Sequence, residues 1–166
     1  MRLGGEPWIV DRGTRRLAVV RTVGDPRRAA RRAVPTLYRA VYTLKLRRKH
    51  AGADFPIEPL RVRWPNAETA PREEWVGLWG LPVPDDVEEL PGLGTPVALE
   101  TWEYGPTAEI VHAGGFATGD ADVLRLRTLV SELGYEPAGA LEEEYLTRPG
   151  SAKARIVIRQ PVRRRR

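Results

Sequence analysis

Three consecutive carboxylates lie in the segment Ala140–Leu146, whose apolar flanks are typical of a β-strand. A carboxylate can act as a general base or hold a cationic ligand, so the direction in which each one points matters. Side chains alternate along a strand, so Glu143 shares one face with Tyr145, and Glu142 and Glu144 share the other. Glu143 is thereby distinguished from its two neighbours.

Two orientations of this strand remain open. In the first, Glu143 faces a pocket beside the Tyr145 ring, and the two neighbouring glutamates are solvated. In the second, all three glutamates are exposed and pair with arginines of the next strand, such as Arg155 and Arg159. The residues alone favour the second, because ionised glutamates are rarely buried and exposed ion pairs are common.

Aromatic side chains are a second candidate feature, since the chain has five tryptophans and five tyrosines. Aromatic rings line small-molecule pockets because they offer a large contact area and stack on flat or cationic ligands. A tryptophan-rich core explains them equally well. The candidates for lining a ligand pocket are Tyr38, Tyr42, Trp64, Trp75, Trp79 and Trp102.

Several kinds of chemistry have no support in the sequence. There is no cysteine, and the two histidines, His50 and His112, do not occur at a metal-ligand spacing, so we expect no metal site. Glycine-rich nucleotide loops and the Gly-x-Ser-x-Gly motif of serine hydrolases are also absent, and we expect no cofactor.

The length of 166 residues is enough for one domain with a single core, or for two fused half-domains. No apolar run approaches the roughly 20 residues of a membrane span, and the first residues lack the apolar core of a signal peptide. We therefore predict a cytoplasmic protein without a membrane partner.

Positive charge is concentrated at the two ends of the chain. The net charge of +5 combines +11 in residues 1–50, −14 in residues 51–146 and +8 in residues 147–166. We expect the basic ends and the acidic middle to neutralise each other in the folded protein, and we predict no specific nucleic-acid partner. Arg163–Arg166 is interpreted as a disordered basic tail that contacts polyanions nonspecifically.

Two helices are predicted from the periodicity of apolar residues. The first begins after the N-cap Asp25 and runs to about Lys49, and Pro35 is expected to kink or restart it. The second is capped by Asp120 or Asp122 and runs to Leu133, after which Gly134 ends it.

Strands are predicted around these helices, so that the order strand, helix, strand, strand occurs twice. This order favours an α+β fold, with a curved and mostly antiparallel sheet, two helices on one side and the other surface left for a ligand. We divide the chain into an N-terminal extension (1–16), a ligand-binding domain (17–162) with pseudo-repeats 17–81 and 97–162, and the tail 163–166. The predicted strands are Leu17–Val23, Leu60–Trp64, Trp75–Leu81, Val97–Tyr104, Ala108–His112, Ala140–Thr147 and Ala154–Gln160.

Five blocks of the chain resemble the GyrI-like small-molecule-binding proteins, and within them the stand-alone members related to cyclopropanoid cyclopropyl hydrolases. They agree in order and spacing over about residues 17–162. The blocks are Leu37–Leu46, similar to "LYxxxYTLK"; Ala108–Phe116, similar to "xxIxHxGPY"; Glu132–Gly139, similar to "ENGYxPxG"; Glu143–Leu146, similar to "EIYL"; and Ile156–Val162, similar to "ILRQPV".

The resemblance implies a duplicated strand-helix-strand-strand fold with a central ligand cleft. In the hydrolase members, a glutamate acts as general base on the strained cyclopropane rings of DNA-alkylating natural products. By position, that catalytic glutamate is Glu143 and its partner is Tyr145, with His112 and Phe116 added to the residues that line the ligand. The sequence departs from the family at Gly114–Phe116, where "GGF" replaces "GPY" and removes a phenol.

Three functions are consistent with this resemblance. The first is hydrolysis of such electrophiles, as a means of detoxification or drug resistance. The second is noncatalytic binding or sensing of lipophilic cations and multiple drugs, and the third is an interaction with DNA gyrase. In the first two, the partner is a hydrophobic or aromatic small molecule.

Overall fold

The computed structural model describes residues 5–92, 96–114, 120–148, 151 and 153–166. The chain forms two compact units. We call Thr14–Trp102 the first unit, and Met1–Gly13 together with Glu103–Arg166 the second unit. No helix among the described residues combines the length and the apolar character that crossing a membrane requires.

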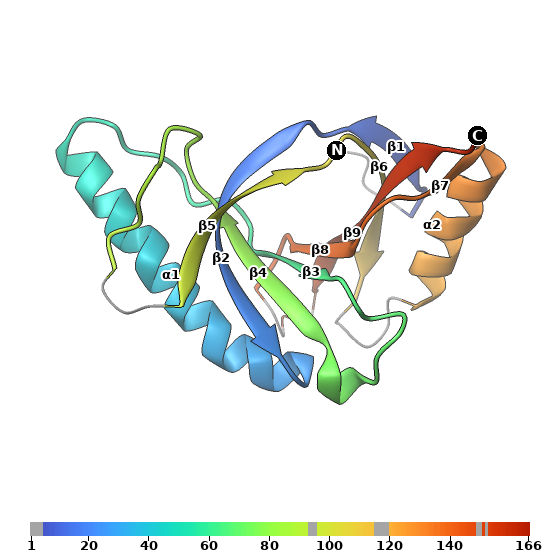
Figure 1. The fold of residues 1–166 in the computed structure, drawn as a ribbon, viewed down its shortest axis with the longest axis horizontal. Helices are drawn as coiled ribbons and strands as arrows, with labels where there is room; N and C mark the ends of the chain where they lie inside the picture. Colours follow the sequence, from blue (N-terminus) through green and yellow to red (C-terminus); the bar gives the residue numbers. More distant parts are fainter. Residues whose placement is uncertain (1–4, 93–95, 115–119, 149–150, 152) are drawn as a thin grey trace. The chain divides into compact units, whose positions relative to one another are not determined.

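The first unit is a sheet with one long helix (Figure 1). Its strands follow the order β3-β4-β2-β5, and β4 pairs antiparallel with both of its neighbours. The helix α1 packs on β2 and β4. The elements are β2 (Thr14–Val23), α1 (Pro26–His50), β3 (Arg61–Trp64), the short 3-10 helix η1 (Arg72–Glu74), β4 (Val76–Pro82) and β5 (Val97–Glu103).

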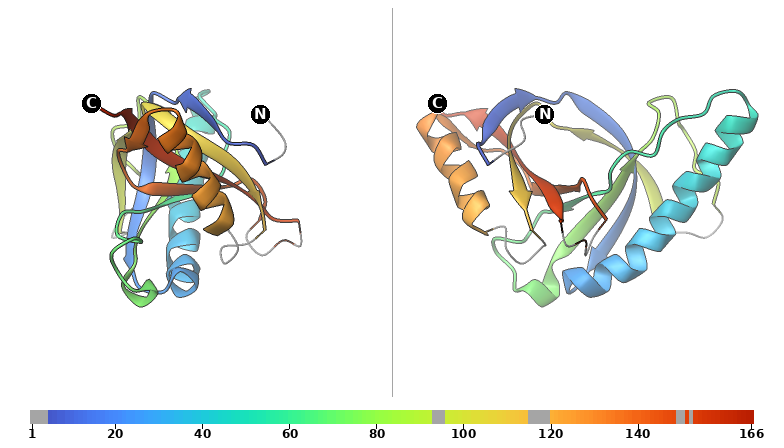
Figure 2. Two further views of the ribbon diagram at one scale, coloured as in Figure 1. Left: turned by 90° about the vertical axis from the view of Figure 1, so that its right-hand side faces the viewer. Right: turned by 180° about the vertical axis from the view of Figure 1, so that it is seen from behind.

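The second unit has the same kind of construction. Its strands follow the order β1-β6-β9-β8, all antiparallel, and β7 pairs with the far end of β9. The helix α2 lies against β6, β7 and β9 (Figure 2). The elements are β1 (Trp8–Asp11), β6 (Pro106–Ala113), α2 (Asp120–Glu132), β7 (Tyr135–Pro137), β8 (Leu141–Tyr145) and β9 (Arg155–Arg164).

The predicted α+β class is confirmed, and the duplicated order is present in the strand arrangement. In each unit the last strand of the repeat, β4 or β9, lies between the first strand and the middle one. Each sheet also gains one strand beside its first strand: β5 beside β2, and β1 beside β6. These added strands directly precede the repeat of the other unit in sequence, so the two repeats exchange their leading strands.

The first helix begins and ends for local reasons. The Asp25 carboxylate accepts hydrogen bonds from the backbone N–H groups of Arg27 and Arg28, and Pro26 occupies the first turn, as predicted. The helix does not restart at Pro35, and it continues to His50. Its apolar face, which includes Leu37, Val41 and Leu44, is buried.

Two details of the second unit differ from the expectations. Asp122 lies inside α2 rather than at its cap. The segment 163–166 is not a disordered tail throughout, because β9 extends to Arg164. Arg163 and Arg164 pair with Glu136 and Tyr135 of β7. Ladder hydrogen bonds hold Arg163 and Arg164, which composition alone marks as a solvated charge run. The other domain boundaries and the central cleft stay predictions.

Candidate functional site

Glu143 and Tyr145 lie on one face of β8, as strand alternation predicts. The Tyr145 hydroxyl donates a hydrogen bond to Glu143 Oε2 at 3.2 Å. The Tyr145 side chain is buried, whereas Glu143 is partly exposed. Burial, followed by the charge and the hydrogen bond of Glu143, raises the pKa of Tyr145 well above its ordinary value. The phenol therefore keeps its proton at neutral pH and serves as a fixed donor to the carboxylate.

His112 lies on the same face of the second unit's sheet. It pairs across strands with Ile156, which in turn pairs with Tyr145, and side chains opposite each other on neighbouring strands point to one face. His112 Nδ1 is 2.7 Å from Asp122 Oδ2, which projects from α2. We call Glu143, Tyr145, His112 and Asp122 the Glu143 face.

Such an Asp–His contact orients an imidazole, because the carboxylate engages one ring nitrogen. His112 is itself buried, and Asp122 also accepts a hydrogen bond from Arg125. The sequence predicts Asp122 only as a candidate helix cap. Its role as the partner of His112 was missed because the two residues meet through the packing of α2 on β6.

The opposite face of the same strands carries a buried ion-pair network. Arg159 lies directly across from Glu109 on one side and from Glu142 on the other. Its guanidinium donates to Glu109 Oε1 and to Glu142 Oε2, both at 2.7 Å, and to Glu144 Oε2 at 3.2 Å. Glu109 and Glu142 are each 0 % exposed.

Two further residues complete this network. Arg12 holds both oxygens of Glu109 at 2.6 Å, in a two-point contact that suits the planar guanidinium. The Tyr104 hydroxyl donates to Glu142 Oε1 at 2.7 Å. We call Arg12, Tyr104, Glu109, Glu142, Glu144 and Arg159 the Arg159 network.

The expectation that both neighbours of Glu143 are solvated is wrong for Glu142. The pairing with Arg159 is correct, but it occurs in the protein interior rather than at an exposed surface. A buried carboxylate is stable here because a buried cation and a phenol satisfy it. Arg12, Tyr104 and Glu109 were not identified from the sequence, and their only signal is a charge, Glu109, within the apolar run of β6.

Within the Arg159 network, the pKa values of Arg159 and Glu109 are both shifted toward the charged form. Burial lowers the pKa of Arg159, but the charges of Glu142, Glu109 and Glu144 outweigh it, and the net shift is upward. Burial likewise raises the pKa of Glu109, but the hydrogen bonds and charges of Arg12 and Arg159 outweigh it, and the net shift is downward.

Acid is therefore expected to weaken the fold through Glu109. Its pKa is lower in the folded state than the ordinary value of 4.5, so its contribution to stability is present above pH 4.5 and is lost as the pH falls below it. Urea unfolding at a series of pH values should show a decline in the free energy of unfolding below pH 4.5. The decline should be less steep in Glu109→Gln, and equal slopes in the two proteins would contradict the assignment.

The predicted pocket tryptophans lie in the first unit, on two faces of its sheet. The centroid of the Trp64 ring lies 5.4 Å from the ring centroids of both Trp75 and Trp79. Trp79 Nε1 donates a hydrogen bond to the Thr22 hydroxyl. A side chain at Gly77 would meet Trp79 and Trp64 within 3.0 Å, so glycine makes room for this cluster.

Trp102 lies over the other face, against Gly80, and the Arg63 guanidinium stacks at 4.1 Å from its ring. Trp64, Trp79 and Trp102 are buried, so all three contribute to the core. Whether they also contact a ligand stays a prediction.

The remaining aromatic candidates are on α1 or outside the described residues. The rings of Tyr38 and Tyr42 stack with centroids 6.2 Å apart, which confirms their common helix face. Burial, with a smaller effect of Tyr42, raises the pKa of Tyr38. Tyr42 is 52 % exposed. Phe116 belongs to residues 115–119, which lie outside the described part of the chain.

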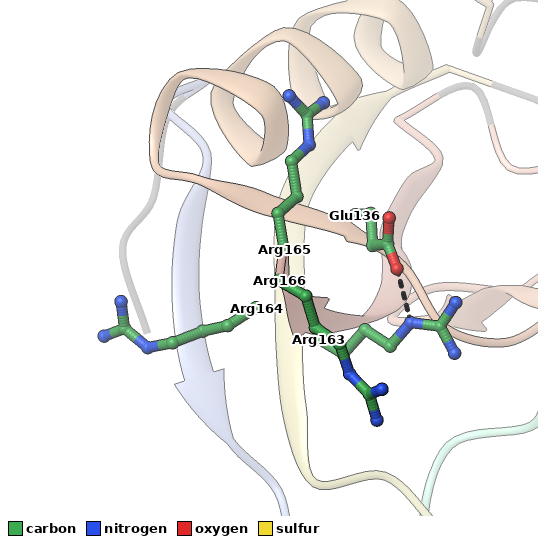
Figure 3. A pocket seen from close by; sticks show the side chains of 5 residues that line it. All are labelled: Glu136, Arg163, Arg164, Arg165 and Arg166. Atoms are coloured by element: carbon green, nitrogen blue, oxygen red, sulfur yellow. Dashed lines mark hydrogen bonds and ion pairs between the residues drawn. The ribbon is translucent and has the colours of Figure 1, made fainter.

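The described residues line cavities that include the following two, and none of the predicted pocket residues lines either of these. One, of about 500 Å³, lies beside Glu136 and Arg163–Arg166 (Figure 3). Its arginine side chains point in different directions, and Arg163 is paired with Glu136 at 2.6 Å. The other, of about 300 Å³, lies between Val20–Val23 and the helix residues Arg32, Ala33 and Thr36. Among the described residues, no three acidic or histidine side chains group as ligands for a metal ion.

Comparison with known proteins supports the fold and leaves the family open. No family model and no curated protein sequence matches the chain. Solved structures do match. An uncharacterized conserved protein from Listeria innocua is similar with a TM-score of 0.83 and 23% identity, over 95% of this chain and 92% of that one.

Two further structures are informative. A hydrolase from Listeria innocua has a TM-score of 0.80 and 22% identity, over 95% of this chain and 92% of its own. The C-terminal domain of EcmrR has a TM-score of 0.73 and 12% identity, over 97% of this chain and 99% of its own. At these identities the likeness shows the fold alone, and the chain has the GyrI-like fold of these structures.

Proposed function

We propose that this protein hydrolyses the cyclopropane ring of electrophilic, DNA-alkylating natural products, with Glu143 as the general base. One observation carries the proposal: a partly exposed carboxylate is held by the hydroxyl of a buried tyrosine two residues along the same strand. The resemblance of Glu143–Leu146 to the hydrolase motif supports it. The similar structure that is described as a hydrolase adds support at low identity.

The reaction needs few groups, because ring strain supplies much of the driving force. Glu143 accepts a proton from a water molecule as the water oxygen attacks a ring carbon. The bond between that carbon and its ring neighbour breaks, and its electron pair moves into the conjugated acceptor of the electrophile. The proton on Glu143 then passes to that acceptor, so the net change is the addition of one water across the bond.

Tyr145 acts as a positioning residue in this proposal. Its hydrogen bond to Oε2 fixes the orientation of the Glu143 carboxylate toward the attacking water. We expect Tyr145→Phe to lower kcat roughly 10- to 100-fold, the equivalent of about 1.5–3 kcal/mol for a hydrogen bond to a charged group. The acidic limb of the pH–rate profile should also move to higher pH, because a carboxylate that loses a donor is protonated more readily.

The pH profile separates this role from a structural one, since a packing defect would lower the rate without moving the limb. An unchanged limb together with an unchanged kcat would contradict the assignment of Tyr145.

The proposed reaction is tested directly by incubating the protein with a cyclopropane-bearing alkylator in ¹⁸O-labelled water. Mass spectrometry should show a ring-opened product that has gained one labelled oxygen, at a rate proportional to protein concentration. A product without label, or no product beyond that of buffer alone, would overturn the proposal.

A second function draws on the same geometry. A carboxylate beside an aromatic ring also suits a lipophilic cation, which the ring attracts by its π-face and the carboxylate by its charge. In this alternative, Glu143 binds and does not react. The Glu143→Gln variant distinguishes the two functions.

A further inference from the structure

The outward face of α1 carries a dense array of cations. The helix contains nine lysine and arginine residues and no acidic residue. Its apolar residues are buried on one side, and successive residues turn by about 100°, so the charged residues emerge on the other side. Six of the seven exposed lysine and arginine residues of α1, all but Arg47, form what we call the α1 cationic face: Arg27, Arg28, Arg31, Arg32, Arg39 and Lys49.

These six side chains are not neutralised within the described part of the chain. The ion pairs of α1 there join Lys45 to Asp54 and Arg48 to Asp86, and neither cation belongs to the α1 cationic face. Tyr42 and Leu46, which are 52 % and 55 % exposed, lie among the six. The face is therefore a cationic surface that also carries the exposed Tyr42 and Leu46 between Arg39 and Lys49.

The placement of these charges opposes the stability of the helix. Four of the arginines occupy the first two turns, where the helix dipole favours anions. Two pairs among them, Arg27 with Arg31 and Arg28 with Arg32, repel each other at a spacing of four residues, at about 0.2–0.5 kcal/mol per pair. A bound polyanion would relieve both effects at once.

We propose that the α1 cationic face binds the phosphate backbone of duplex DNA without sequence preference. The helix of 25 residues is about 37 Å long, so its cations follow a stretch of phosphates rather than a single one. Five of the six are arginines, whose planar guanidinium matches phosphate oxygens. Ion pairs such as Arg12–Glu109 and Arg48–Asp86 neutralise part of the basic first segment, as expected, whereas the cations of the α1 cationic face are gathered on one surface.

Duplex DNA fits this face better than an anionic membrane does. A helix that binds at a membrane surface inserts its apolar face among the lipids. The apolar face of α1, including Leu37 and Val41, is instead buried against the protein's own sheet. Only Tyr42 and Leu46 remain for contact with lipid.

This inference goes beyond the proposed hydrolysis and does not depend on it, because its test needs no electrophile. Fluorescence anisotropy of a labelled duplex of about 20 base pairs, titrated with the full chain at several NaCl concentrations, measures binding. Three arginines are then replaced together, in Arg28→Gln/Arg31→Gln/Arg32→Gln. The matched control is Arg148→Gln/Lys153→Gln/Arg155→Gln, which removes the same charge from exposed positions outside α1 and outside the basic tail.

We expect wild-type binding to weaken with salt, and the slope of log K against log salt to become less negative by about 2.7 in the helix variant, about 0.9 for each phosphate that is no longer neutralised. The control should keep the wild-type slope, and the helix variant should keep or raise the wild-type melting temperature. Equal slopes in wild type and helix variant, a weaker slope only in the control, no binding at 50 mM NaCl, or tighter binding to phosphatidylserine vesicles than to DNA would each overturn the proposal.

Discussion

Replacement of Glu143 with Gln is expected to lower the rate of cyclopropane hydrolysis by about 10²–10⁴-fold, the usual contribution of a general base. The amide keeps the size of the side chain and can still accept the hydrogen bond of Tyr145 through its oxygen. It cannot take a proton from water. Ligand affinity, measured by quenching of tryptophan fluorescence, should therefore change little while turnover is lost.

Glu144→Gln is the matched control, because it makes the same chemical change on the next residue of β8, which points to the opposite face. Its hydrogen bond to Arg159 is the longest of the three that Arg159 donates to the Arg159 network, at 3.2 Å. This variant should retain turnover. Unchanged hydrolysis in Glu143→Gln, or equal losses in both variants, would rule out Glu143 as the base.

The same variant separates hydrolysis from simple binding of cations. If the protein only binds lipophilic cations, neutralising Glu143 should remove their binding, and no electrophile should yield a product in the wild type. If the protein is a hydrolase, neutral electrophiles should still bind to the variant. The substitution is thus expected to abolish ligand binding if the protein only binds cations, and to leave ligand binding intact if it is a hydrolase.

Replacement of Arg159 with Met is expected to have the largest effect on stability. The change leaves Glu109 and Glu142 buried without the cation that lies between them. Removal of one partner from a buried ion pair costs about 3–5 kcal/mol, because the remaining charge is uncompensated. Here the loss falls mainly on Glu142, because Glu109 keeps its two-point contact with Arg12. Urea unfolding at pH 7, followed by circular dichroism, should show this loss in the free energy of unfolding.

Arg155→Met provides the control for this substitution, because Arg155 lies on the same strand and is exposed. It should cost less than about 1 kcal/mol. A triple variant, Glu109→Gln/Glu142→Gln/Arg159→Met, should recover part of the stability, since it also removes the negative charges of the two buried glutamates. A loss in Arg159→Met no larger than in the control would show that the network does not stabilise the second unit.

Much of the fold follows from local signals. The cap at Asp25, the apolar period of α1 and the stop at Gly134, whose φ of 76° suits glycine, each depend on a few neighbouring residues. The strands around Val62 and Ile158 follow from apolar residues in short runs that end at turn residues. The exchange of β1 and β5 between the two units had no such signal, because strand partners are chosen by packing over the whole chain.

The candidate site likewise has features that the sequence predicts and features that depend on distant residues. Alternation along β8 was enough to pair Glu143 with Tyr145, because that geometry is a property of any strand. Burial of Glu142 was not predictable from the sequence, since it requires Arg159 and Tyr104 to arrive from distant segments in the right register. The charge of α1 is a further case, because summing charges along the sequence hides the direction in which a helix presents them.

The sequence by itself therefore determined the two repeats, the class of the fold and the face on which Glu143 lies. Those properties depend on backbone geometry and on residues that are close to one another in the sequence. Only the tertiary structure decided which charges are buried, as at Glu142, and which are gathered on a surface, as on the α1 cationic face. The cost of burying a charge depends on whether a distant partner compensates it, and that partner is set by the register of strands far apart in the chain.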